Sequence, residues 1–571
     1  MYEEIQKRIR KSIEDVIEER IEKTDVQESE IADFTSPVAF KLARKFRKSP
    51  IEVARNISQR ISCPRYVQRV EARNGYINFY LGYTEIFPDL MKRVLADREK
   101  YGSHKNQKVK IILEHTSINP SGPVHIGRLR NSLIGDSVAR ILKFCGYDVE
   151  THYYVNDIGK QIAIISQGFK EGVEPDSKAI ETYQKYEKRG DFAVFFGYVT
   201  ANRRFESDPE FAERVQESIR KAEGGDKGVL AKISNIAKMC LDGQKEVFKK
   251  LGIEFDRFDF ESDYIKDGSI RDIVEFLKTT EHWKTTEYGA GLDLSKFGIE
   301  KRGGISIILR NDGTSVYLAR DIAYHLYKSK QGDRMINVLG EDHKLEFQEL
   351  KTILTEIYKL KTPLDVIHYS FVNFEGMELS TRKGLTAPID LLIDEAIKKS
   401  EREIVKRGIA SKSMAPSIGI GAIKYHILKT SPLKQISFVW EDALDFEGES
   451  SPYIQYAHAR CCGIIEKSDF DIVKDSNIIV GKEFDDKEKK LIFEILKFPV
   501  IIEKSAEELK PNIIANYLYK LSSEFSRFYK ECPVLKAEDN IKRRRILLVY
   551  STRAILKTGL NLLGIDAPGR M

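Results

Sequence analysis

The sequence predicts a multidomain α/β protein, in which a parallel-sheet domain lies between an α+β N-terminal module and an all-α C-terminal domain. The length of 571 residues is too great for a single hydrophobic core. A strand–helix–strand pattern between residues 109 and 155 is the building unit of a parallel sheet. From about residue 400 onwards, apolar residues recur at helical spacing.

Residues 1–95 are predicted to form the N-terminal module. Apolar residues recur at helical spacing from Tyr2 to Ile21. Serine–proline pairs at 36–37 and 49–50 are typical of helix starts, and "GYINFYLG" at 75–82 indicates a strand. The polar stretch "REKYGSHKNQ" that follows predicts a linker between this module and the next core.

The N-terminal module also carries a strong local positive charge. From Ser36 to Gly75, ten Lys or Arg residues stand against two acids. Such a run is either a solvated helix face or a surface that contacts the phosphates of a nucleic acid, and charge alone leaves both readings open. A smaller basic cluster, "IKRRR", lies at 541–545. The net charge of the whole chain, +6, excludes no class of partner.

Residues 108–395 are predicted to form the parallel-sheet domain. Buried strands are expected at 109–115 and Asp148–Val155, with an amphipathic helix from about His125 to Phe144 between them. A mostly helical, charged stretch from about 165 to 255 indicates an insertion. Two apolar segments, "RMINVLGEDH" and "VIHYSFVNF", predict further strands, and helical patterns predict a connecting region and a terminal domain at 396–445 and 446–571.

Composition argues against several functional classes. The sequence has no apolar run long enough to span a bilayer, and its first segment has the pattern of a helix and not of a signal peptide. The six cysteines are scattered without a CxxC pair, which argues against a zinc site and a disulfide scaffold. We therefore expect a cytoplasmic protein with no structural metal.

The strand-to-helix junction "VHIGR" at 124–128 is typical of a phosphate site. A helix that begins at the carboxyl end of a parallel strand presents free N–H groups and the positive end of its dipole. Gly127 lets a base or ribose approach the backbone, and His125 can donate hydrogen bonds to phosphate oxygens. The sequence lacks both GxGxxG and GxxxxGK[ST], which excludes the common dinucleotide and P-loop patterns.

The wider string "SINPSGPVHIGRLRNSLIGDSVARILKFCGYDV" resembles the first signature of class I aminoacyl-tRNA synthetases, and specifically of arginyl-tRNA synthetases. "GMELSTRKG" at 376–384 stands where this family has its second, mobile phosphate-binding signature. "SPYIQYAHAR" and the ending "NLLGIDAPGRM" are similar to the family's helical anticodon-binding domain. The basic N-terminal module resembles the family's extra domain, which contacts the tRNA elbow.

This resemblance implies a Rossmann-type catalytic domain and an arginine–tRNA ligase that uses ATP with Mg²⁺ and a cognate tRNA. It also implies that the tRNA must bind before arginine is activated. It implies an arginine-binding set, which comprises Glu114, Ser117, Asn119, Tyr317, Asp321 and Asp342. It implies an ATP-binding set, which comprises Pro123, His125, Gly127, Gly340, Asp342 and His343. The implied catalytic residues are His125, Gly127, Arg128, Ser380, Arg382 and Lys383.

Two of these assignments have independent support. Tyr317 and Asp321 are four residues apart on a predicted helix and so share one face, where a carboxylate beside a phenol suits a guanidinium. Glu114 ends a buried strand, where a carboxylate needs a cationic partner. We expect that partner to be the substrate arginine.

The sequence departs from the family in both signatures. Arg128 replaces the final histidine of the first, and Glu378 and Thr381 replace the two lysines of the second. We expect Arg382 and Lys383 to supply the missing charge. A class I enzyme for another amino acid and an inactive paralogue that only binds tRNA remain as alternatives, although a cysteinyl enzyme would need zinc ligands that this sequence lacks. A monomer is expected.

Overall fold

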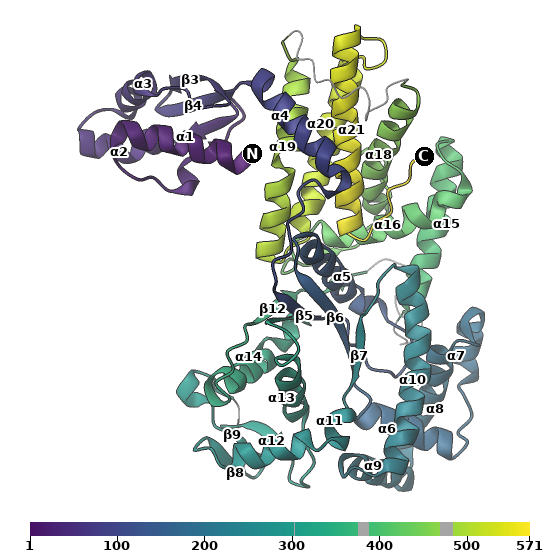
Figure 1. Cartoon of the computed structure of the whole chain (residues 1–571). Coiled ribbons are helices and arrows are strands. Elements are labelled where there is room, and N and C mark those ends of the chain that lie inside the picture. The colour runs from purple at the N-terminus through teal and green to yellow at the C-terminus, as the bar shows by residue number, and fades with distance from the viewer. Residues whose placement is uncertain (302, 375–386, 469–482) are drawn as a thin grey trace.

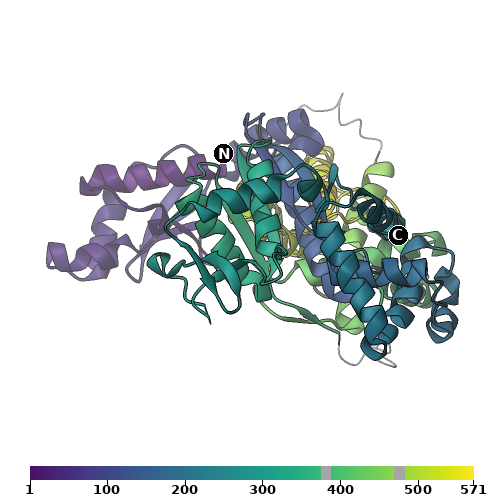
Figure 2. The same ribbon diagram turned by 90° about the horizontal axis from the view of Figure 1, so that it is seen from below.

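The predicted fold class is confirmed. The structure is a computed structural model that describes residues 1–301, 303–374, 387–468 and 483–571 (Figure 1). An N-terminal module lies beside a C-terminal helical bundle, and a domain with a central parallel sheet lies below the bundle in this view. Seen from below, the N-terminal module and the helical insertion lie on opposite sides of the molecule (Figure 2). Among the described residues, every helix is too short or too polar to cross a membrane.

The N-terminal module is a four-stranded antiparallel sheet, in the order β1-β2-β4-β3, covered by helices. Ser49 begins α3 with a capping box, because its hydroxyl accepts from the Glu52 N–H and the Glu52 carboxylate accepts from the Ser49 N–H. The elements are α1 (Tyr2–Ile17), β1 (Gln27–Glu28), β2 (Phe34–Ser36), α2 (Val38–Phe46), α3 (Pro50–Arg60), β3 (Val67–Arg73), β4 (Tyr76–Leu81) and α4 (Tyr83–Asp97).

The stretch expected to be a polar linker does not separate two cores. Tyr101 within it is buried, and its ring stacks on Phe498 of the C-terminal bundle with centroids 6.3 Å apart. Tyr2 and Phe34 of the N-terminal module pack on Phe493, with ring centroids 5.9 and 5.6 Å away. One hydrophobic core therefore runs from the module through the bundle into the catalytic domain. Burial of the Tyr101 ring holds this segment against the bundle, although most residues around Tyr101 are polar.

The central sheet has five parallel strands in the order β12-β11-β5-β6-β7. The strands are β5 (Lys110–Glu114), β6 (Asp148–Val155), β7 (Arg257–Phe260), β11 (Arg334–Gly340) and β12 (Leu364–Tyr369). Between the first two of these lies α5 (Leu129–Phe144), which begins after a 3₁₀ turn at Ile126–Arg128. Glu114 in β5 is opposite Asn337 of β11 on one side and His152 of β6 on the other.

The helical insertion follows β6, and a smaller antiparallel sheet, in the order β10-β9-β8, precedes β11. The insertion contains α6 (Lys160–Lys170), α7 (Ser177–Thr182), α8 (Gly190–Ser207), α9 (Pro209–Glu223) and α10 (Lys227–Lys250). The segment after β7 contains α11 (Asp263–Lys266), α12 (Ser269–Lys278), β8 (Trp283–Thr286), β9 (Gly289–Leu292), β10 (Ser306–Leu309) and α13 (Tyr317–Lys328). α14 (Lys344–Thr352) joins β11 to β12.

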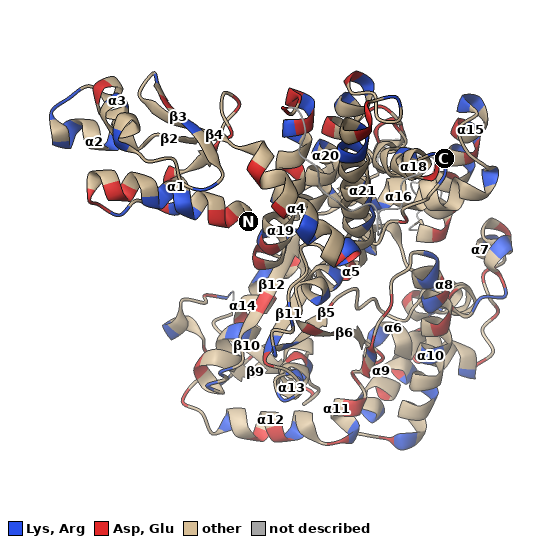
Figure 3. Cartoon of the chain, turned by 45° about the horizontal axis from the view of Figure 1, so that its top comes forward, with Lys and Arg blue, Asp and Glu red and all other residues tan. Residues whose placement is uncertain are grey.

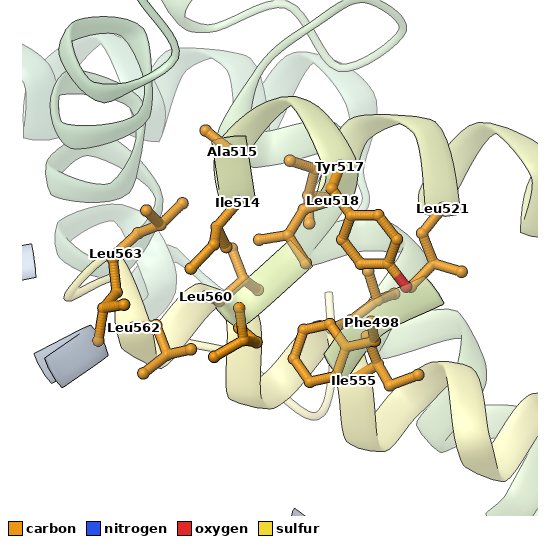
Figure 4. Packing of buried hydrophobic residues seen from close by; sticks show 14 of the residues in the cluster. Phe498, Ile514, Ala515, Tyr517, Leu518, Leu521, Ile555, Leu560, Leu562 and Leu563 are labelled. Carbon is orange, nitrogen blue, oxygen red and sulfur yellow. The ribbon is translucent and has the colours of Figure 1, made fainter. Parts of the chain in front are cut away.

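The C-terminal part is helical. Phe498, Leu518 and Leu560, from three different helices, pack together in its core (Figure 4). Its elements are β13 (Val372–Asn373), which pairs with β14 (Ile436–Ser437), and α15 (Ile389–Arg407), α16 (Ala415–Leu428), α17 (Trp440–Ala443), α18 (Ser451–Glu466), α19 (Asp486–Glu508), α20 (Asn512–Glu531) and α21 (Asp539–Leu562). In the cluster at 541–545, Arg544 and Arg545 pair with buried Glu488 inside this bundle.

A buried lysine joins three parts of the chain. The ammonium of Lys424, in α16, donates to the carbonyls of Leu251, just after α10, and of Gly564, just after α21. Beside it, Arg140 of α5 donates to the Gly252 carbonyl at 2.6 Å, and Ser137 donates to the Leu562 carbonyl at 2.9 Å. The insertion and the bundle are thus both fixed to the helix that follows the "VHIGR" junction. We call this cluster the Lys424 joint.

Candidate active site

The candidate site lies at the carboxyl ends of the central strands, where ligands of parallel α/β sheets bind. Glu114 ends β5, and Gly340 ends β11 beside it. After Glu114 the chain turns sharply, because Thr116 and Ser117 have φ angles of 74° and 43°. Asn131 of α5 accepts from the Thr116 N–H at 2.6 Å and holds this strained turn in place.

Glu114 is buried and already has a cationic partner within the chain. Its Oε2 accepts from the Lys328 ammonium at 2.6 Å and from the Asn337 amide at 3.1 Å. Its Oε1 accepts from the Ser117 hydroxyl at 3.2 Å. Burial alone would raise the pKa of Glu114, but the Lys328 ammonium holds it below its ordinary value. Glu114 thus has a cationic partner before any substrate binds, and the expectation that it also contacts arginine stays a prediction.

Tyr317 and Asp321 share one face of α13, as their spacing predicts. Tyr317 is the first residue of the helix and is 53% exposed. Its hydroxyl would lie 3.5 Å from a side-chain carbon at Gly159, an ordinary van der Waals distance, so the ring lies over the start of the insertion. Asp321 is half-buried, and its carboxylate forms no hydrogen bond with the described residues. Burial and the nearby Glu114 raise the pKa of Asp321 to about 7.

His325 connects Asp321 to Lys328. Its Nδ1 lies 2.8 Å from the Asp321 carbonyl, and its Nε2 lies 3.2 Å from the Lys328 ammonium and 3.0 Å from the Asn337 amide. Since Nδ1 must donate to the carbonyl, Nε2 is the acceptor. Burial, reinforced by Lys328, lowers the pKa of His325 to about 3, so the ring is neutral.

His325, Lys328 and Asn337 were not expected from the sequence. A signal for two of them exists, because His325 and Lys328 follow Asp321 by four and seven residues and so continue the same helix face. Asn337 lies on another strand and becomes a neighbour only through the pairing of β11 with β5. Asn119 is exposed, and its amide donates to Gln161 at 3.1 Å.

The "VHIGR" junction lies at the same edge of the sheet. A side-chain carbon at Gly127 would lie 3.1 Å from the His125 ring, a tight contact that would make the ring shift by a few tenths of an ångström. His125 Nδ1 is buried and has no hydrogen-bond partner among the described residues. Burial, followed by the charge of Arg128, lowers the pKa of His125 to about 4, so the ring is neutral at pH 7. Pro123 and Arg128 are half-buried on either side.

The start of α15 is hydrogen-bonded to this junction. Ile126 N–H donates to the Ala387 carbonyl at 3.0 Å, and Ile389 N–H donates to the Val124 carbonyl at 2.9 Å. Asp390 of the same helix binds Arg189 of the insertion through both carboxylate oxygens, at 2.6 and 2.7 Å. Thus the insertion, α15 and the junction form one connected unit.

The remaining expected residues divide into two groups. Asp342 and His343 lie just after Gly340, and His343 Nε2 is 3.6 Å from Asp342 Oδ2 with both side chains about half exposed. A side-chain carbon at Gly340 would lie 2.2 Å from Asp342 Oδ1, so the Asp342 side chain would have to move. The other group, Ser380, Arg382 and Lys383, together with Glu378, lies outside the described residues.

The basic run of the N-terminal module is only partly neutralised within the chain (Figure 3). Four of its ten cations pair with acids, namely Lys41, Lys45, Arg65 and Arg69. The other six form no ion pair with described residues, namely Arg44, Arg47, Lys48, Arg55, Arg60 and Arg73. Phe40 and Tyr76, 45% and 43% exposed, lie among them with ring centroids 5.0 Å apart. Unpaired cations and exposed rings together suit a nucleic acid.

Family comparisons cover nearly the whole chain. The family described as "tRNA synthetases class I (R), catalytic domain" matches residues 90–440. The family described as "Arginyl tRNA synthetase N terminal domain" matches residues 3–81. The family described as "DALR anticodon binding domain" matches residues 454–571.

Individual proteins are similar over their full length. The arginine–tRNA ligase of Methanocaldococcus jannaschii is 41% identical, over 95% of this chain and 94% of that protein. The arginine–tRNA ligase of Methanothermobacter thermautotrophicus is 38% identical, over 100% of both chains. The solved structure of Thermus thermophilus arginyl-tRNA synthetase is 25% identical, has a TM-score of 0.78 and covers 99% of this chain and 100% of its own.

Proposed function

Since this chain belongs to the arginyl-tRNA synthetase family of class I enzymes, we propose that the residues gathered at the carboxyl edge of its sheet bind arginine and ATP. The chain is an arginine–tRNA ligase, which joins L-arginine to tRNA at the expense of ATP. The observation that carries the site proposal is Asp321, a half-buried carboxylate that forms no hydrogen bond with described residues and lies on the same helix face as Tyr317.

In the proposed arginine pocket, the Asp321 carboxylate accepts from the guanidinium and the Tyr317 hydroxyl lies beside it. A guanidinium presents paired N–H groups that suit a carboxylate, and the charge-assisted contact is strong. Ser117, Asn119 and Asp342 are proposed to contact the rest of the amino acid, and Glu114 Oε1 retains capacity for a second donor besides Ser117.

ATP is proposed to bind over the "VHIGR" junction. Pro123 and Gly127 would leave room for the adenosine, and Gly340 and His343 would lie at the neighbouring strand end. Mg²⁺ would arrive with the phosphates, as part of the nucleotide substrate. An oxygen of the arginine carboxylate attacks the α-phosphorus, and the bond to the leaving pyrophosphate breaks. His125, neutral with its Nδ1 unpartnered, can donate one hydrogen bond as charge develops on the phosphate, and Arg128 adds a positive charge nearby.

The second signature is proposed to supply further charge through Arg382 and Lys383, with Ser380 next to them. Changing both cations to alanine should lower the activation rate about a hundredfold, with little effect on the KM for ATP, since these contacts would form in the transition state. Glu378→Ala is the control and should be nearly neutral. A double variant that activates arginine at the normal rate would move the role to Arg128.

The proposed working form is a cytoplasmic monomer, for which the six free thiols are a supporting observation, because thiols stay reduced in the cytoplasm. The N-terminal module is proposed to contact the tRNA elbow, and the C-terminal bundle to contact the anticodon. Exposed rings such as Tyr76 would stack on unpaired bases.

ATP–pyrophosphate exchange with each amino acid in turn, with and without tRNA, tests the proposal. We expect that arginine is the one amino acid that supports exchange, and that it does so only when tRNA is bound. Exchange with another amino acid would identify a different class I specificity. Binding of tRNA without any exchange would instead identify an inactive paralogue.

A further inference from the structure

The proposed arginine pocket contains a cation of its own. Lys328 ends α13, and its side chain is fully buried. Its ammonium lies 2.6 Å from Glu114 Oε2, 3.2 Å from Asn337 Oδ1 and 3.2 Å from His325 Nε2. An ammonium has three hydrogens to donate, so each has an acceptor here, and the single lone pair of His325 Nε2 is shared with the Asn337 amide at 3.0 Å. The ring of Tyr324 covers it at 4.3 Å from the ring centroid. The charge is therefore fixed in position.

The partners of Lys328 determine how Glu114 is presented. Lys328 and Asn337 both donate to Oε2, whereas among the described residues Oε1 accepts from the Ser117 hydroxyl alone. Each carboxylate oxygen can accept two hydrogen bonds. Oε2 is thus filled by the chain itself, and Oε1 can accept one more donor. Without the ammonium, a buried ionised carboxylate would be strongly disfavoured and would take up a proton.

The same ammonium also acts on Asp321. The two carboxylates repel each other, and Lys328 is the cation that offsets this repulsion most directly, with Arg320 contributing less. Arg320 is itself committed to Glu261 at 2.9 Å and to Glu223 at 3.5 Å, and Glu261 is a further buried carboxylate that interacts with Asp321. With Lys328 paired to Glu114, Asp321 is the carboxylate of the pair whose charge has no partner in hydrogen-bond contact among described residues.

We propose that Lys328 is a positioning residue for arginine recognition: it holds Glu114 so that Oε1 can accept one more donor besides the Ser117 hydroxyl, and it leaves Asp321 as the carboxylate of this pair that the guanidinium neutralises. This inference rests on the proposed function, since it deepens the assignment of the same pocket. It explains why an acidic pocket for a cationic substrate is built around a buried lysine. The lysine cancels one of two charges, so that Glu114 is ionised and Asp321 can lose its proton more easily when arginine arrives.

The groups that face Lys328 define what should titrate. They are Glu114 from β5, Asn337 from β11, and His325, Tyr324 and Asp321 from α13. His325 is already neutral, and removal of the Lys328 charge would leave the ring neutral near pH 7. Glu114 and Asp321 are therefore the two groups whose pKa values should rise when the ammonium is removed.

Lys328→Met tests the inference, because methionine keeps most of the stem and removes the charge. At pH 7 the KM for arginine should rise about tenfold or more, while kcat and the KM for ATP change by less than about twofold. Because Glu114 and Asp321 both ionise at higher pH, the difference in arginine KM between Lys328→Met and the parent protein should become smaller toward pH 9. Lys328→Arg keeps a cation and should recover much of the affinity. A fluorescence or calorimetric titration with arginine measures the same shift independently of turnover.

A double variant separates positioning from a merely structural role. Lys328 is inferred to act through the charge of Glu114. In the double variant Glu114→Gln with Lys328→Met, the pH profile of arginine KM should therefore lose the shift to higher pH that Glu114 contributes. The effects of the two substitutions on arginine KM should not be additive. A pH profile of arginine KM in Lys328→Met that matches the parent protein would overturn the inference. If Lys328→Met fails to fold, the double variant and Lys328→Arg still decide, since an arginine KM at the parent value in the double variant, or no difference between Lys328→Arg and the double variant, contradicts the inference. Failure of the proposed function would look different, because the parent protein itself would then show no exchange with arginine.

Discussion

Two buried lysines, Lys328 in the proposed arginine pocket and Lys424 in the joint between domains, hold their charges in different ways. Lys328 lies 2.6 Å from a carboxylate oxygen. Lys424 instead donates to two backbone carbonyls, and its nearest acids act only at longer range. Burial lowers the pKa of Lys424 to about 8. The pocket thus balances charge with charge, whereas the joint balances it with peptide dipoles.

The dipoles at the Lys424 joint come from helix ends. Leu251 and Gly564 follow the last residues of α10 and α21, where unpaired carbonyls carry partial negative charge. Gly564 has a φ of 65°, and a side-chain carbon there would lie 2.8 Å from Asp136 and 3.2 Å from the Lys424 ammonium. The comparison teaches that one kind of residue can serve recognition in one region and architecture in another, and that its partners tell which.

The largest expected effect tests the recognition side of this comparison. Asp321→Asn should raise the KM for arginine about thirtyfold or more and leave that for ATP nearly unchanged, because a charge-assisted contact is worth about 2–3 kcal/mol. Steady-state pyrophosphate exchange measures both constants. Asp272→Asn, on the exposed face of α12, is the matched control. An unchanged arginine KM in Asp321→Asn would remove this residue from the pocket.

The next effect tests the architectural side. Lys424→Met leaves two buried carbonyls without their donor, at a cost of about 3 kcal/mol, and should lower the thermal midpoint by about 2–3 °C. The KM for arginine should stay within about twofold of the parent value. Lys412→Met, at an exposed position just before α16, is the control and should leave the midpoint unchanged. A large change in arginine KM without loss of stability would place Lys424 on the recognition side.

A smaller effect concerns pH, and it has opposite signs in the two regions. Burial raises the pKa of Asp321 from 3.8 to about 7, so the folded state keeps a proton that the unfolded chain loses, and stability falls as pH rises through this window. Burial lowers the pKa of Lys424 from 10.5 to about 8, so the unfolded chain keeps the extra proton, and stability rises with pH in that window.

Thermal midpoints across pH measure these two slopes. Relative to the parent protein, Asp321→Asn should become more stable as pH rises from about 4 to 7, because it lacks the raised carboxyl. Lys424→Met should become relatively less stable as pH rises from about 8 to 10, because it lacks the lowered ammonium. Parallel midpoint curves for either variant and the parent protein would contradict the corresponding assignment.

The smallest effect involves cations that are not buried at all. Arg47→Ala with Lys48→Ala removes two unpaired charges from the N-terminal module and should weaken tRNA binding about threefold. The negative slope of log affinity against log salt concentration should become shallower by about 2. Lys45→Ala with Arg69→Ala removes two paired charges and should change the slope less. Equal slopes in both double variants would mean that the run is a solvated face.

Much of the fold could be predicted from the sequence, because the strands and helices bury their apolar residues at regular spacing. The strand-to-helix junction at His125 could also be predicted, because its strand, loop and helix follow one another in the sequence. The partner of Glu114 was not, because Lys328 is 214 residues away and meets it only once the strands are in register. Tyr101 likewise could not be predicted as an anchor, since its partner Phe498 lies in a distant helix.

The continuous core also imposes an order of events during synthesis on the ribosome. α4 buries an apolar face against α19 and α21, and Met91 accepts from the Ser551 hydroxyl at 3.4 Å. At about 5–20 residues per second, these partners emerge about 20–80 s after α4 itself. For that time the nascent chain exposes Ile86, Leu90 and Val94, which are fully buried later. Holding this face away from premature contacts is then a task for chaperones, and truncated products that end before α19 should be their persistent clients.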